Sequence, residues 1–201
     1  MSNQRRKYTK RRRAENEQET RQRITEAAVA LHGSVGPART TISAVAEEAG
    51  VQRATVYRHF PDEESLFAAC SGHWAALNPA PDLAAWEAIV DPTARLRQAL
   101  ADTYAYYSRN ETMIENVIRD RPLVAAMAKP VARRLAYLAA AVDAIVAGRP
   151  ERGHARRRVR AAVGHAVAFT TWRSLVREEG LEETEAVAVM AATVAAAGRA
   201  R

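Results

Sequence analysis

The side chains best suited to bind another molecule lie within seven consecutive positions: Arg53, Thr55, Tyr57, Arg58 and His59. Arginine can contact the edge of guanine through two hydrogen bonds, and threonine, tyrosine and histidine suit phosphate oxygens. Val56 and Phe60 are four residues apart, so a helix here would bury both and turn the polar residues to its other sides. This pattern is typical of a recognition helix, which enters the DNA major groove; we call the predicted one the reader helix.

The residues before this helix predict a second short helix and a tight turn. Thr40 is placed to cap that helix. Apolar residues then recur at helical spacing: Ile42, Val45, Ala46 and Ala49. Gly50 can adopt the left-handed conformation that ends a helix, Val51 is expected to pin the turn to the core, and Gln52 can start the next helix. The pattern indicates a helix-turn-helix, although helix–glycine–helix alone also fits an ordinary hairpin with a solvated polar face.

The segment from Thr40 to about Phe67 resembles the TetR family of transcriptional regulators. The similarity is concentrated in the stretches AEEAGV, residues 46–51, and ATVYRHF, residues 54–60. The resemblance implies that Thr41 contacts phosphate, that residues 53–55 face base edges, and that residues 57–59 hold the DNA backbone or read further bases. The expected DNA-binding residues of this segment are therefore Thr41, Gln52, Arg53, Ala54, Thr55, Tyr57, Arg58 and His59.

One position departs from the family pattern. Members often carry a lysine at the start of the helix after the reader helix, where it contacts phosphate, but this chain has Pro61, Asp62, Glu63 and Glu64 there. Acidic residues suit a helix N-terminus, but they repel DNA at close range. Part of the phosphate binding must therefore come from elsewhere in the chain.

The basic residues of the N-terminal segment are candidates for that role. Residues 1–13 contain seven basic and no acidic residues, whereas the other 23 basic residues balance the 23 acidic ones, so this segment carries the whole net charge of +7. Such a charge block is expected to be disordered over residues 1–14. Fully extended, thirteen residues span about 43 Å, enough to follow the DNA backbone or enter a minor groove. We expect Arg11, Arg12 and Arg13 to contact DNA; a solubilising tail is the alternative.

The remaining sequence predicts only helices. They are expected at Glu15–Leu31, from Pro61 to about Leu77, from Pro92 to Asn110, at Met113–Ile118, at Val131–Val146, at Val159–Val176 and from Glu182 to Ala197. No segment shows strand periodicity. The predicted fold is all-α, with a basic arm over 1–14, a three-helix helix-turn-helix DNA-binding domain over 15–67 and a helical ligand-binding and dimerisation domain over 68–201.

The last helix predicts self-association. Its body, Ala186–Ala197, is apolar on nearly every side, and in a small chain such a helix is most easily buried at a subunit interface. We expect a two-fold homodimer through the last two helices, roughly Arg156–Ala197, as the resemblance also implies. Two reader helices about 34 Å apart could then contact successive major grooves of a double-stranded operator.

The resemblance further implies a small-molecule effector site within the C-terminal helices. The candidate lining residues are Trp86, Tyr104, Tyr107, Met113, Ile114, Val117, His165, Phe169 and Trp172. Aromatic and methionine side chains supply apolar area, and tyrosine and histidine supply polar contacts. Each of these residues also fits an ordinary helical core.

Several function classes are disfavoured. Glu151 and His154 have the spacing of a di-iron motif, but a second copy is missing and glycines and prolines surround them. No catalytic or phosphate-binding motif is found, so we expect no enzyme, no cofactor and no metal.

The sequence favours a cytoplasmic protein, because it has a single cysteine, Cys70, no long apolar run and no signal peptide. The sequence indicates a DNA-binding transcriptional regulator, a repressor released from a palindromic operator by a small molecule; the alternative is a non-specific nucleic-acid or membrane-surface binder driven by the arm.

Overall fold

The computed structural model describes residues 2–199, with side chains from Arg11 onward, and every regular element in this range is helical. The all-α prediction is confirmed. The chain forms two compact units, of which the first contains the residues up to Asn78 together with Thr112–Val131. The second contains Pro79–Glu111 together with the residues from Ala132 onward. No helix among the described residues is long and apolar enough to cross a membrane.

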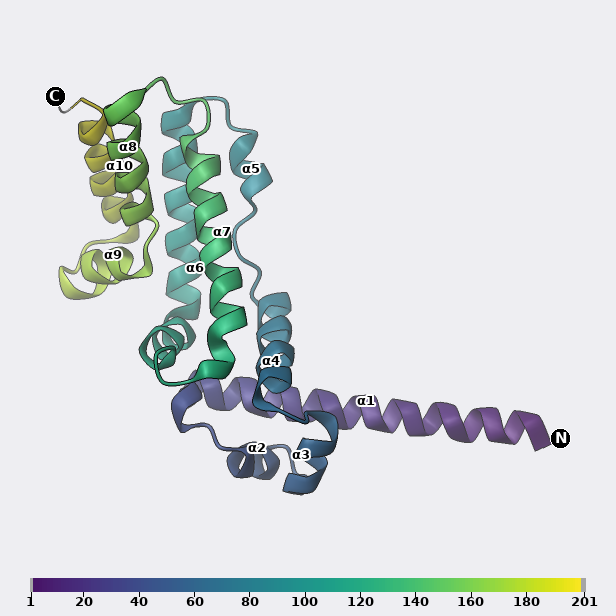
Figure 1. The fold of residues 1–201 in the computed structure, drawn as a ribbon. Helices are drawn as coiled ribbons and strands as arrows, with labels where there is room; N and C mark the ends of the chain where they lie inside the picture. Colours follow the sequence, from purple (N-terminus) through teal and green to yellow (C-terminus); the bar gives the residue numbers. More distant parts are fainter. Residues whose placement is uncertain (1, 200–201) are drawn as a thin grey trace. The chain divides into compact units, whose positions relative to one another are not determined.

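The first unit is built on a long helix and a helix-turn-helix (Figure 1). Its elements are α1 (Ser2–Ser34), a 3-10 turn at Pro37–Arg39, α2 (Ile42–Glu48), α3 (Arg53–His59), α4 (Glu63–Leu77), the end of α6 (Pro92–Asp120), a second 3-10 turn at Ala125–Met127 and the first residues of α7 (Ala128–Val146). The boundary expected between residues 67 and 68 falls within α4. This helix stays whole in the first unit because Leu66, Phe67 and Cys70 are buried along it.

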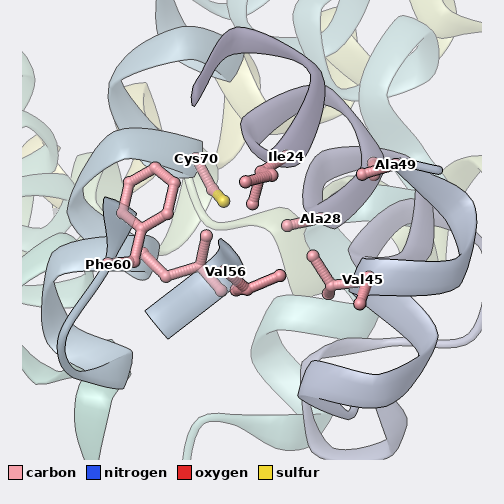
Figure 2. Packing of buried hydrophobic residues seen from close by; sticks show 10 residues of the cluster. Ile24, Ala28, Val45, Ala49, Val56, Phe60 and Cys70 are labelled. Carbon is pink, nitrogen blue, oxygen red and sulfur yellow. The ribbon is translucent and has the colours of Figure 1, made fainter. Parts of the chain in front are cut away.

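A small apolar core joins α1 to the three helices that follow (Figure 2). Ile24 and Ala28 of α1 meet Val45 of α2, Val56 of α3 and Cys70 of α4, and all five are essentially inaccessible to solvent. Burial of these side chains supplies most of the stability of helices as short as α2 and α3, which are too short to persist alone. The core therefore fixes how the reader helix is presented.

The basic N-terminal segment differs from its expected form. Residues 2–14 continue the backbone of α1 as a helix, where we expected disorder over residues 1–14. Arginine, lysine, glutamine and glutamate are good helix formers, and the Arg11–Glu15 ion pair at 2.9 Å lies one turn apart on the helix. The helical propensity of these residues and their attachment to a packed helix outweigh the charge repulsion on which the expectation rested. As a helix, thirteen residues reach about 20 Å rather than 43 Å.

The second unit is a helical bundle. It contains α5 (Leu83–Glu87), α6 up to Glu111, most of α7, α8 (Gly153–Ala166), α9 (Phe169–Arg173), a π-helical turn at Ser174–Glu178 and α10 (Glu183–Arg199). The helices α8 and α10 pack side by side (Figure 1). The predicted start at Pro92 is confirmed, and α6 has a non-helical residue at Asn110, where the sequence indicated the end of one helix.

The helix expected over Val159–Val176 is wrong as a single element. The chain leaves α8 at Val167, passes through an extended residue, Ala168, with φ −73° and ψ 139°, and starts α9 at Phe169. The carbonyls released at the break accept hydrogen bonds from side chains: Tyr104 donates to Ala166 at 2.9 Å and Tyr107 to Val167 at 2.6 Å. These contacts satisfy the end of α8 without a glycine or proline, so no local signal marks the break.

Candidate functional site

The turn of the helix-turn-helix is closed by backbone hydrogen bonds. Gly50 has φ +64°, its N–H donates to the Glu47 carbonyl at 3.0 Å, and the Val51 N–H donates to the Ala46 carbonyl at 2.9 Å. This pair of bonds is a Schellman ending, which requires a left-handed residue at the glycine position. Val51 is partly buried against the core cluster, as expected. The turn therefore holds α3 at a defined angle to α2.

The cap of α2 is Thr41, and the expectation for Thr40 is wrong. Thr41 is extended, with φ −98° and ψ 154°, and its Oγ1 accepts a hydrogen bond from the Ala44 N–H at 3.1 Å. The Thr40 hydroxyl instead donates to the Gly36 carbonyl at 2.9 Å and so belongs to the preceding turn. Thr41 is exposed, and its hydroxyl can still donate a hydrogen bond to a phosphate oxygen.

The helix α3 presents one exposed polar face. Val56 and Phe60 are buried, as predicted, and the residues on the opposite side are exposed: Gln52, Arg53, Ala54, Tyr57 and Arg58. Tyr57 exposes 48% of its surface, which is unusual for a large aromatic residue. The structure thus brings two guanidinium groups and a phenol onto one helix face, where they can contact base edges and phosphates.

Thr55 and His59 lie apart from that face and are only half-exposed. The Nε2 atom of His59 is buried and has no hydrogen-bond partner among the described residues. Burial lowers the pKa of His59, and the charges of Arg58 and Arg21 lower it further, so the imidazole carries no charge with which to attract phosphate at neutral pH. As DNA-contacting residues, the geometry therefore favours Arg53, Ala54, Tyr57 and Arg58 over Thr55 and His59.

Arg21 contacts the C-terminal end of the reader helix, a role that the sequence did not indicate. Its Nη1 donates to the His59 carbonyl at 2.5 Å, and its guanidinium carbon lies 4.0 Å from the centre of the Phe60 ring. A cation at the C-terminus of α3 pairs with the negative end of the helix and with an otherwise unpaired carbonyl. Arg21 therefore fixes the end of the reader helix from α1, 38 residues away in sequence.

The acidic start of α4 is partly neutralised. Asp62 caps the helix by accepting a hydrogen bond from the Ser65 N–H at 2.7 Å, and Glu64 pairs with Lys129 of α7 at 2.6 Å. Glu63 remains exposed in the first turn. Lys129 thus brings a positive charge to the region where the family pattern places a lysine. Because 65 residues separate the two partners, no local pattern indicated this pair.

The basic residues of the N-terminal segment that the structure describes with side chains are exposed: Arg11, Arg12 and Arg13. Arg11 pairs with Glu15 at 2.9 Å, and that pair is open to solvent. An exposed ion pair of this kind contributes little to stability, so it does not prevent the arginine from binding an anion.

The expected effector-site residues divide between the two units. Met113, Ile114 and Val117 belong to the first unit and are half-buried, while the others belong to the second, where His165 is exposed. Tyr107, Phe169 and Trp172 form an aromatic cluster with ring centroids 5.3–6.0 Å apart. Tyr104 is buried at the same helix break as Tyr107, by its bond to Ala166.

Two tryptophans of the second unit differ in how their indole N–H groups are paired. Trp86 donates to the Asp102 carboxylate at 2.8 Å. Trp172 is fully buried, but its Nε1 has no hydrogen-bond partner within the described part of the chain. A buried N–H without a partner carries a desolvation penalty of about 1–3 kcal/mol. This atom is the unsatisfied polar group of the aromatic cluster.

The remaining expectations concern metal chemistry. Glu151 binds Arg149 at 3.0 Å, whereas His154 contacts Arg157 at 2.6 Å, so the two residues of the possible di-iron spacing have separate arginine partners. Within residues 2–199, no three or more His, Cys, Asp or Glu side chains are gathered into a group that could hold a metal ion.

Comparison with known proteins agrees with this geometry. Residues 24–70 match the family model of the bacterial regulatory proteins of the tetR family. No curated protein matches the chain. A tetR-family transcriptional regulator from Streptomyces coelicolor has 21% identity and a TM-score of 0.63, with 90% of this chain and 80% of that chain covered.

Two further solved structures share the fold. A TetR-like transcriptional regulator from Rhodococcus sp. RHA1 has 17% identity and a TM-score of 0.63 over 90% of this chain and 97% of that one. The transcriptional regulator FadR from Bacillus subtilis, solved in complex with stearoyl-CoA, has 15% identity and a TM-score of 0.56 over 86% of this chain and 96% of that one. Residues 24–70, which contain the helix-turn-helix, therefore match the DNA-binding segment of the tetR family, and the whole chain has the fold of TetR-family transcriptional regulators.

Proposed function

We propose that this regulator is a repressor that binds a palindromic operator and is released from it by a small molecule. The observation that carries the proposal is the exposed face of α3, with Arg53, Tyr57 and Arg58 held outward by the closed turn at Gly50. Two arginines and an exposed tyrosine on a short, rigidly held helix match the chemistry of base edges and phosphates. We assign Thr41 and Ala54 to the same contact surface.

We infer a two-fold dimer through α8 and α10, which would suit a palindromic operator. The exposed side of α10 contains small and apolar residues, among them Val189, which is 44% exposed. Small side chains let helices approach closely, so this side suits a partner helix. A dimer that places two reader helices about 34 Å apart would select two half-sites of opposite orientation.

The aromatic cluster of the second unit is the proposed effector site. Trp172 has a buried N–H without a partner, and Tyr107 and Phe169 border its ring. A ligand acceptor that bonds this N–H would remove its desolvation penalty. FadR provides a solved case of a ligand-bound structure with this fold. A coupling of about 1–3 kcal/mol between effector and operator would be enough for release.

The test is selection of DNA fragments with the purified protein, followed by affinity measurements on a recovered fragment and a scrambled duplex. We expect a preference of at least about 1000-fold for the recovered fragment, which should contain an inverted repeat. Arg53→Ala should weaken specific binding about 10- to 100-fold, and Tyr57→Ala should also weaken it. Arg97→Ala, an exposed arginine of the second unit, is the control and should bind normally.

Equal affinity for every duplex would contradict the proposal. That result would instead support a non-specific nucleic-acid binder driven by the basic residues of α1, whose affinity depends on salt and not on sequence.

A further inference from the structure

The end of α6 places three connected polar side chains within the DNA-binding unit, outside the segment that matches the family. Asn116 and Asp120 are 5% and 2% exposed, respectively, although both are polar. Arg119 joins them, since its Nη1 donates to Asn116 Oδ1 at 2.8 Å and its Nε donates to Asp120 Oδ1 at 2.6 Å. Buried polar groups are rare unless paired, so their partners indicate what the group holds in place.

Asn116 holds the end of α1. Its Nδ2 donates to the carbonyls of His32 and Gly33 at 3.0 and 2.8 Å. The last carbonyls of a helix have no partner within the helix, so a side-chain donor from another element can fix where the helix ends. The turn toward the helix-turn-helix begins directly after these carbonyls.

Asp120 holds that turn. Its Oδ2 accepts a hydrogen bond from the Ala38 N–H at 3.0 Å and another from Arg119 Nη2 at 3.0 Å. The guanidinium of Arg119 and the hydrogen bond from Ala38 both lower the pKa of this carboxyl group, so it remains ionised and a strong acceptor at neutral pH. Charge-assisted bonds of this kind hold a backbone N–H more firmly than neutral ones.

The turn is shaped to fit this group. Gly36 has φ +94°, and a Cβ atom there would collide with Arg119 Nη2 and would lie 2.5 Å from Asp120 Oδ2. The lack of a side chain at Gly36 is therefore what lets the turn close over the carboxylate. The turn ends at Thr40, whose N–H and hydroxyl bond back to Pro37 and Gly36, and Thr41 follows as the cap of α2.

We infer that Asn116, Arg119 and Asp120 are positioning residues for DNA recognition: they fix the Gly36–Thr40 turn and thereby set where Thr41 and α2 meet the DNA. The inference rests on the proposed function. The inference goes beyond the proposed function because it assigns part of the operator specificity to residues that do not themselves contact DNA. These residues follow the family-matching segment by about fifty positions.

The test compares Asp120→Ala with Asp120→Asn and with Thr112→Ala, an exposed control on the same helix. Unfolding midpoints are measured first, and binding is measured well below them on the fragment selected by the wild-type protein and on a scrambled duplex. We expect Asp120→Ala to weaken binding to the selected fragment about tenfold and to change binding to the scrambled duplex less than about twofold. Asp120→Asn retains an acceptor oxygen and should recover part of the affinity, and Thr112→Ala should match the wild type.

Amide hydrogen exchange gives a readout that needs no DNA. The Ala38 N–H bonds to Asp120, and the Ala44 N–H bonds to the Thr41 cap, so both should exchange faster in Asp120→Ala. If both keep their wild-type rates, or if the folded variant loses affinity equally for both duplexes, the inference is wrong. If Asp120→Ala does not fold, Asn116→Ala is tested in the same way.

The two hypotheses fail in distinguishable ways. A wild-type protein that does not discriminate between duplexes contradicts the proposed function. Normal discrimination in the wild type and in a folded Asp120→Ala variant contradicts only the inference.

Discussion

The buried histidine of the DNA-binding unit shows how one residue can make stability depend on pH. His32 is 6% exposed, and its ring stacks on Phe67 with centroids 4.7 Å apart and planes 12° apart. Burial lowers the pKa of His32 to about 4, although the nearby Asp120 opposes this shift. The imidazole is therefore neutral in the folded protein at pH 7, which suits its stacked, mostly apolar surroundings.

Acidification should destabilise this unit because His32 resists protonation. Since the folded pKa of about 4 lies below the ordinary value of 6.5, the unfolded chain binds the proton first as pH falls. The contribution of His32 is fully present above pH 6.5, and roughly 3 kcal/mol should be lost as pH falls from 6.5 to 4. Urea unfolding at several pH values, compared with His32→Phe, measures this loss. An equal pH dependence in the variant would assign the effect to other groups.

For single residues, the sequence predicted the features that depend on neighbouring positions and missed the contacts between segments far apart in the chain. The exposed face of α3 follows from the spacing of Val56 and Phe60, and the turn follows from Gly50. The roles of Lys129 and Asp120 depend on segments that lie far apart in sequence, which local periodicity does not reveal. The sequence also led to the wrong cap, Thr40 instead of Thr41, because both are threonines at adjacent positions and only the turn at Gly36–Thr40 distinguishes them.

The helical form of the N-terminal segment of α1 changes how its basic residues can reach DNA. A helical N-terminal segment carries its charges on a rod with a rise of 1.5 Å per residue, whereas an extended arm could enter a minor groove well beyond the reader helix. We therefore assign Arg11, Arg12 and Arg13 to phosphate contacts close to the helix-turn-helix.

Removing these charges should weaken the salt dependence of binding. Each lost phosphate contact reduces the slope of log affinity against log salt by about one unit. The double variant Arg12→Gln, Arg13→Gln should therefore lose up to about two units and keep its preference for the selected fragment. Arg97→Gln, an exposed arginine of the second unit, is the control and should keep the wild-type slope. A wild-type slope in the double variant would show that the two arginines only solubilise the segment.

The break between α8 and α9 could not be predicted from the local sequence pattern, because residues far away in the chain cause it. Apolar residues continue at helical spacing across Val167 and Ala168, so the sequence favours one helix. The structure ends it there because the hydroxyls of Tyr104 and Tyr107, about sixty residues earlier, bind the released carbonyls. The break in α6 at Asn110 was predictable by contrast, since asparagine suits such positions and its side chain bonds the Tyr106 carbonyl at 2.8 Å.

For the whole molecule, the two units share the chain in an interleaved order. Thr112–Val131 belongs with the DNA-binding unit, although it follows the first part of the second unit. The chain thus crosses between the units three times. A truncation after α4 would remove Asn116, Asp120 and Lys129 from the DNA-binding unit, so the family-matching segment alone lacks contacts that this unit uses.

The proposed dimer is a property of the whole molecule that a single substitution can test. On α10, Val187 is 8% exposed and Val189 is 44% exposed, so a charge at Val187 is placed in the core of one chain and a charge at Val189 is placed on its surface. Val189→Asp should leave the unfolding midpoint of the monomer nearly unchanged, convert the dimer to monomers, and weaken operator binding at least about 100-fold through loss of the paired half-site. Val187→Asp should instead lower the free energy of unfolding by about 3 kcal/mol or more. Sedimentation measures the oligomeric state, urea unfolding the stability and fragment binding the affinity. A Val189→Asp protein that remains dimeric would move the interface away from the exposed side of α10.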